Sequence, residues 1–170
     1  MLRYANFQPV KPKKGRDSIG GLLAVAAVCG MIASRKTGAD DTLELATGKA
    51  GFFLSRDVVS EGDFKTALEQ QELYPDKNQF ELPCKVGGSV QAEDFQEVWV
   101  EGAALLDASM DAATVVRAPV TSAAGKFAEL TNSETQECLG FVVLNEAARN
   151  GGGGRRFLIQ IARSGLSNVI

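Results

Sequence analysis

The residues that could do chemistry in this 170-residue chain are few and widely separated. The chain contains no histidine, which excludes Ser-His-Asp and Cys-His nucleophile pairs and histidine-ligated zinc or iron. Asp57, Glu61 and Asp63 could supply a carboxylate pair for acid/base work, as in glycosidases. They lie on an expected loop without clustered aromatic side chains for sugar stacking. A solvated acidic face is therefore the favoured interpretation.

The three cysteines, Cys29, Cys84 and Cys138, are widely spaced and form no CxxC pair. A zinc site needs close pairs of thiolates or histidines, so we expect no metal site. Cys84 has no base near it in the sequence to activate it as a nucleophile. Cys29 and Cys138 stand in apolar runs, which favours buried free thiols and a reducing compartment.

Two further patterns could bind ions. Asp40, Asp41 and Glu44 offer oxygen ligands for a cation but lack the spacing of an EF-hand loop, and a solvated turn is favoured. Residues 151–154 are four glycines followed by two arginines, a combination suited to phosphate. A P-loop also needs Lys-Ser/Thr at the start of a helix, and here a strand is expected instead. We therefore expect no cofactor, no catalytic residue and no enzymatic activity.

Composition indicates a globular protein, because 45% of the residues are apolar and 23% are charged. The net charge of −3 is unevenly distributed: residues 1–17 carry a net +4 and residues 57–101 a net −8. A basic arm on an acidic body favours head-to-tail contact with copies of the same chain or with an acidic partner. A solvated tail and a solvated acidic face are the alternative. The acidic body argues against nucleic-acid binding.

The basic N-terminus and the apolar run after it, residues 19–33, together look like a secretory signal peptide. Gly20 and Gly21 would weaken a helix at its start, and a 15-residue run is short for a membrane span. We therefore expect no membrane association. The small apolar residues from Leu22 to Ser34 fit one long strand or two short ones.

The chain divides into an extended arm, residues 1–18, and a body, residues 19–170. The arm contains Pro9 and Pro12 and has no amphipathic period. Such arms are either disordered or ordered by a neighbouring subunit.

One segment of the body has a helical pattern. Ser60 can cap a helix with Asp63 in the third position, and Pro75 ends the pattern. This predicts one short helix at about residues 61–73.

The rest of the body shows short apolar or alternating runs with turn residues between them. The expected strands cover residues 42–46, 52–59, 80–86, 95–101, 103–107, 114–120, 126–131, 138–145 and 156–162. Many short strands at regular spacing predict a mainly β fold, a small β-barrel or β-sandwich. An internal echo relates residues 30–59 to residues 102–145, each with a glycine before a strand and a later Gly-Phe before an apolar strand.

This order of elements, ending in an arginine-rich closing strand at residues 155–161, resembles the head-decoration or capsid-cement proteins of tailed bacteriophages. Residues 30–59 and 98–161 carry the resemblance. It implies a structural virion protein on the outside of the capsid, made in the host cytoplasm. Its partners would be the major capsid protein and copies of itself, often as a trimer.

The resemblance further implies that the arm reaches across neighbouring capsid subunits. The expected partner-binding residues are the basic and aromatic residues of this segment: Arg3, Tyr4, Phe7, Lys11, Lys13, Lys14 and Arg16. Two alternatives remain open. One is a tail, neck or other assembly subunit of a phage, and the other is a small β-barrel that binds a ligand or acts as an enzyme.

Overall fold

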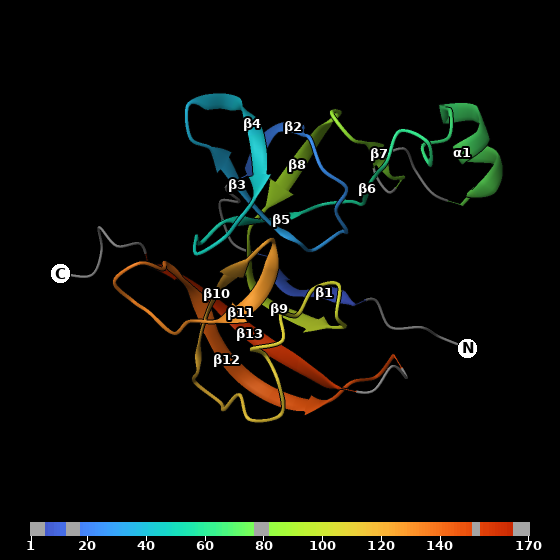
Figure 1. Ribbon diagram of the computed structural model, residues 1–170. Helices are drawn as coiled ribbons and strands as arrows, with labels where there is room; N and C mark the ends of the chain where they lie inside the picture. The colour runs from blue at the N-terminus through green and yellow to red at the C-terminus, as the bar shows by residue number, and fades with distance from the viewer. Residues whose placement is uncertain (1–5, 13–17, 77–81, 151–153, 165–170) are drawn as a thin grey trace.

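A five-stranded barrel and a six-stranded sheet make up most of the molecule (Figure 1). The computed structural model describes residues 6–12, 18–76, 82–150 and 154–164. The prediction of a mainly β protein with a barrel and one short helix is confirmed. In Figure 1 the barrel lies above the six-stranded sheet, and the helix stands to one side of the barrel.

The six-stranded sheet is antiparallel throughout. Its strands lie in the order β1 (Phe7–Pro12), β9 (Phe95–Glu101), β13 (Arg155–Ser164), β12 (Cys138–Ala147), β10 (Pro119–Ala123) and β11 (Lys126–Glu129). Alternation along β9 buries Val98 and Val100 completely and leaves Trp99 only partly covered. One face of the sheet is therefore built for a core.

The barrel closes in the order β2 (Ser18–Leu23), β4 (Ala39–Leu45), β3 (Ile32–Lys36), β5 (Phe52–Leu54) and β8 (Ser89–Glu93). The β2–β4 pair is parallel, and the other pairs are antiparallel. Its interior is filled by aliphatic side chains of modest size, among them Leu23, Leu43 and Val90. Small aliphatic residues suit the narrow interior of a barrel with few strands.

The barrel and the six-stranded sheet share one core. Ile32 and Phe53 of the barrel belong to the same buried cluster as Val100 and Phe127 of the sheet. The rings of Phe53 and Phe127 stack with centroids 5.6 Å apart and an interplanar angle of 7°. Full burial of each such side chain contributes about 1.5–3 kcal/mol, so the two sheets stabilise each other.

Two glycines of the internal echo stand where the backbone of another strand comes very close. A Cβ atom at Gly51 would lie 2.3 Å from the carbonyl oxygen of Ala33, and one at Gly140 would lie 2.1 Å from that of Gln160. Both positions therefore require glycine for close strand approach. The first echo segment belongs to the barrel and the second to the six-stranded sheet, and the repeat itself stays a prediction.

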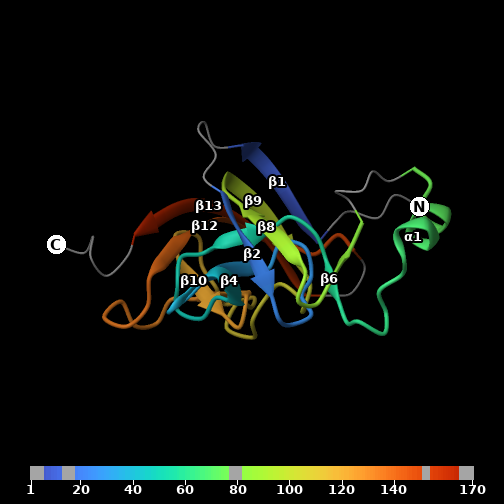
Figure 2. The ribbon, with the colours of Figure 1, turned by 90° about the horizontal axis from the view of Figure 1, so that it is seen from above.

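A long excursion leaves the barrel between β5 and β8. Its base is a two-stranded parallel pair, β6 (Val58–Val59) and β7 (Cys84–Lys85), and it carries helix α1 (Ala67–Leu73). Seen from above, α1 stands apart from both sheets (Figure 2).

Helix α1 begins at Ala67, whereas the sequence predicts a start near residue 61. Thr66 is the N-cap: its hydroxyl accepts the Glu69 N–H at 3.3 Å, while the Glu69 carboxylate accepts the Thr66 N–H at 2.9 Å. Ser60 instead donates its hydroxyl to Asp63 within a turn. Both segments fit the capping pattern, and the reciprocal bonds that complete a capping box form at Thr66.

Two strand predictions need correction, and one strand was missed. Residues 103–107, expected as a strand, form a turn followed by a single bridge from Leu106 to Phe127, and β10 begins at Pro119 rather than at residue 114. Strand β8 was not predicted, although Val90 and Ala92 alternate with exposed or half-exposed residues along it. Two apolar residues in a five-residue strand give too short a pattern to separate from a loop.

Candidate partner-binding surface

Part of the expected arm forms the edge of the six-stranded sheet. Strand β1 pairs antiparallel with β9, with Phe7 opposite Val100 and Lys11 opposite Glu97. The pairing register shifts on both sides of Lys11. β1 stands at the end of the strand order, so its second side faces no other strand of this sheet. The boundary between arm and body at residue 18 stays a prediction.

Phe7 points into the protein's own core. Its ring centroid lies 5.4 Å from that of Phe53 and 6.0 Å from that of Phe95. Gly30 lies directly beneath it, where an added Cβ would come within 2.4 Å of the Phe7 ring. Phe7 is only partly buried, and this packing fastens β1 to the body; its expected role in binding a partner stays a prediction.

Lys11 lies on the surface of the same strand. Its ammonium group forms an ion pair with the Glu97 carboxylate at 3.4 Å, and 59% of its side chain remains exposed. An exposed pair of this kind contributes less than about 1 kcal/mol, so Lys11 can exchange Glu97 for another acidic group at little cost. The adjacent Val10 is 44% exposed. The other expected binding residues, Arg3, Tyr4, Lys13, Lys14 and Arg16, lie outside the residues that the structure describes.

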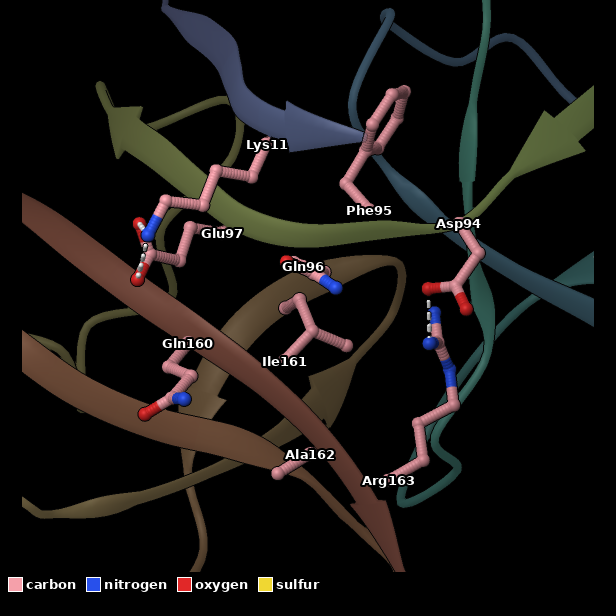
Figure 3. A pocket seen from close by; sticks show the side chains of 9 residues that line it. All are labelled: Lys11, Asp94, Phe95, Gln96, Glu97, Gln160, Ile161, Ala162 and Arg163. Carbon is pink, nitrogen blue, oxygen red and sulfur yellow. Dashed lines mark hydrogen bonds and ion pairs between the residues drawn. The ribbon is translucent and has the colours of Figure 1, made fainter. Parts of the chain in front are cut away.

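A groove of about 410 Å³ runs between β1, β9 and β13. Figure 3 shows its polar lining: the Lys11–Glu97 pair at one end, the Asp94–Arg163 pair at the other, and Gln160 near the first pair. Each of these four charged side chains is paired within the chain.

Arg163 joins the two sheets, and the sequence analysis did not single it out. From β13 its guanidinium reaches the barrel and donates two hydrogen bonds to the Gly51 carbonyl, at 3.1 and 2.9 Å. It also pairs with Asp94, whose side chain is almost completely buried, and stacks 4.7 Å from the Phe52 ring centroid. Arg163 lies two residues beyond the arginine-rich closing strand expected at residues 155–161, and its partners are distant in the sequence, so no local pattern pointed to this role.

The three carboxylates considered for acid/base chemistry each make a separate contact. Asp57 accepts the backbone N–H of Cys29 at 2.7 Å, Glu61 pairs with Lys85 at 3.0 Å, and Asp63 accepts the Ser60 hydroxyl. The Asp57 contact ties the base of the β6–β7 excursion to the segment before β3. The Glu61–Lys85 pair is exposed and contributes little to stability.

All three cysteines are free thiols, as expected. Cys84 is buried, whereas Cys29 and Cys138 are only half-buried. Burial, reinforced by the nearby Asp57 carboxylate, raises the pKa of Cys29 to about 11. Burial also raises the pKa of Cys84. Both thiols are protonated at neutral pH, which makes them poor nucleophiles.

Within the residues that the structure describes, no three His, Cys, Asp or Glu side chains lie close enough together to hold a metal ion. No helix within those residues has the length and apolar character needed to span a membrane.

Comparison with solved structures finds a similarity to the crystal structure of the head fiber gp8.5 N base in bacteriophage phi29. The two chains are 14% identical, the match covers 89% of this chain and 98% of that one, and the TM-score is 0.49. No family model matches the sequence, and no curated protein matches it.

Proposed function

We propose that this protein is a structural protein of a bacteriophage particle, which binds the outside of the capsid and cements neighbouring major capsid subunits. The observation that carries the proposal is the edge of the six-stranded sheet, where the basic N-terminal segment supplies β1 and exposes Val10 and Lys11. A firmly packed β body with such an edge can hold a neighbouring chain. The resemblance carried by residues 30–59 and 98–161 supports the same role.

The prolines of β1 decide what kind of contact this edge can make. Pro9 and Pro12 have no N–H to donate, so a neighbouring chain cannot form a long uninterrupted ladder along the strand. This also protects the edge from uncontrolled polymerisation. Contact with a capsid subunit would then rest on the exposed Val10 and Lys11 and on the remaining basic residues of the segment.

Weak contacts of this kind suffice when symmetry repeats them. A protein that binds several capsid subunits at once, or that binds as an oligomer such as a trimer, gains effective concentration from each contact already made. The net charge of +4 over residues 1–17 suits an acidic capsid exterior.

The decisive experiment is density-gradient sedimentation of the source lysate, with each fraction analysed for this chain by mass spectrometry. We expect it to travel with full and empty heads at a fixed ratio to the major shell protein. Cosedimentation with separated tails alone would assign the protein to the tail or neck of the particle. Recovery only at the top of the gradient, as a small unattached species, would reject a virion role.

A charge-reversal variant tests the binding edge itself. Lys11→Glu combined with Lys13→Glu and Lys14→Glu should release the protein from heads at a lower salt concentration than wild type. Lys36→Glu with Arg117→Glu is the control, because both residues are exposed and belong to other parts of the chain. Release of both variants at the same salt concentration would show that the edge formed by β1 does not bind the capsid.

A further inference from the structure

Helix α1 presents an apolar surface to solvent. Leu68 is 70% exposed, Leu73 is 59% exposed, and Tyr74, the C-cap residue, is 51% exposed. Among the residues of α1 whose burial is described, the buried one is polar: Gln70 is only 5% exposed, and its side-chain amide donates to the Pro83 carbonyl at 3.5 Å. A helix on the surface of a protein normally buries its apolar side. In α1 the apolar side chains are exposed and a polar one is buried. An exposed apolar surface of this kind is typical of a site that binds a partner.

Acidic residues surround this apolar surface. Residues 60–76 contain five acidic side chains and one lysine, a net charge of −4. The acids are Glu61, Asp63, Glu69, Glu72 and Asp76. A partner suited to α1 must therefore combine positive charge with apolar side chains.

The chain's own N-terminal segment has that composition. Residues 1–17 carry a net charge of +4 and include the apolar residues Leu2, Tyr4 and Val10. We propose that the apolar, acidic surface of α1 is the docking site for the N-terminal segment, residues 1–17, of a second copy of this chain.

The fold favours a second copy over the same copy. Phe7 anchors β1 in the six-stranded sheet, and Figures 1 and 2 show α1 beyond the barrel, apart from β1. Val10 and Lys11 of one copy are thus held away from α1 of that copy. Each chain offers one segment and one helix, so the contact is head-to-tail and joins copies in a ring or a row. It requires no capsid, and it uses the same segment, residues 1–17, that the function proposed above assigns to capsid binding.

The test measures association of the purified full-length chain by sedimentation velocity. We expect concentration-dependent association in 0.1 M NaCl that weakens at least tenfold in 1 M NaCl, because screening shortens the Debye length from about 10 Å to 3 Å. Leu68→Ser with Leu73→Ser should weaken association to a similar degree. Val115→Ser with Val116→Ser is the matched control, since these valines are 67% and 52% exposed on another part of the surface.

A charge-swap experiment identifies the occupant of the helix. One variant neutralises the net charge of the segment (Lys13→Glu, Lys14→Glu, from +4 to 0), and another neutralises that of residues 60–76 (Glu72→Lys, Asp76→Lys, from −4 to 0), leaving the Thr66–Glu69 capping box intact. Neither variant should associate with itself. A mixture of the two should associate in pairs, because the unchanged basic segment of the helix variant meets the unchanged acidic α1 surface of the segment variant.

Three results would overturn the proposal. The first is a wild-type chain that stays monomeric at every concentration in 0.1 M NaCl, whether because α1 binds another protein or because the segment folds back on its own copy. The second is a charge-swap mixture that stays monomeric although circular dichroism shows both variants to be folded. The third is association that is as strong in the Leu68→Ser/Leu73→Ser variant as in the Val115/Val116 control.

Discussion

The ring of Phe7 fills the space that a side chain at position 30 would need: an added Cβ at Gly30 would lie 2.4 Å from the ring. Gly30 also has a φ of +90°, a conformation that L side chains rarely adopt. The contact of Phe7 with Gly30 therefore adds to the β1–β9 pairing in fastening the N-terminal strand to the body.

Gly30→Ala should destabilise the protein by about 2–4 kcal/mol, because it combines backbone strain with a collision against Phe7. Urea unfolding measures the loss. Gly38→Ala is the control: Gly38 has a φ of +80° with nothing within 4 Å of an added Cβ, so it should cost only about 1 kcal/mol. Equal losses in the two variants would mean that Phe7 does not occupy the space above Gly30.

Arg163→Met should destabilise the protein by about 3 kcal/mol, because it removes the cationic partner of the buried Asp94 together with the hydrogen bonds to Gly51. Lys11→Met, at the other end of the same groove, should cost less than about 1 kcal/mol, since the Lys11–Glu97 pair is exposed. Chemical denaturation of both variants provides the comparison. A similar loss in the two would contradict the role of Arg163 in joining the sheets.

The capping box of α1 should weaken in acid. Hydrogen bonds from the Thr66 backbone and hydroxyl hold the pKa of Glu69 below its ordinary value of 4.5. The stabilisation is therefore fully present above pH 4.5 and is lost as the pH falls through the lower, folded-state pKa. Amide exchange of α1, referred to that of β9, should accelerate over this range in wild type. In the Glu69→Gln variant, amide exchange of α1 should be faster than in wild type at neutral pH and should change less as the pH falls.

Cys29 should resist alkylation in the folded protein. With a pKa of about 11 instead of 9.0, its thiolate population at pH 8 is lower by roughly 100-fold, and its reaction with iodoacetamide should slow accordingly. A variant with Cys84→Ser and Cys138→Ser isolates the signal. The same variant in 8 M urea should react at the rate of an ordinary thiol, and a rate unchanged by urea would disprove the shift.

The parts of the fold that the sequence predicted are those with a strong local pattern. Phe95–Glu101 alternates and is rich in aromatic and β-branched residues, and it forms β9 as expected. The short helix was also expected, but its start was not. Ser60 and Thr66 are each followed three residues later by an acidic residue, so both fit the sequence pattern of an N-cap. Which of them caps the helix depends on which carboxylate accepts the backbone N–H of the N-cap residue, and this is Glu69.

The contacts around the proposed binding edge were predicted only in part, because they join segments that are distant in the sequence. Phe7 was grouped with the basic residues of the arm, yet its neighbours Phe53 and Phe95 are far away in the sequence and draw it into the core. Arg163 was overlooked for the same reason, since its partners lie at Gly51 and Asp94. Local patterns report secondary structure, whereas a side chain's role follows from which strands become neighbours.

Strands β8 and β9 are separated by a single residue, Asp94. One almost continuous extended segment of backbone therefore forms a strand of the barrel and then an inner strand of the six-stranded sheet. A mechanical load applied to one sheet is transmitted to the other through the backbone, because no flexible linker separates these two strands. The two sheets therefore move as one rigid unit, without a hinge between them.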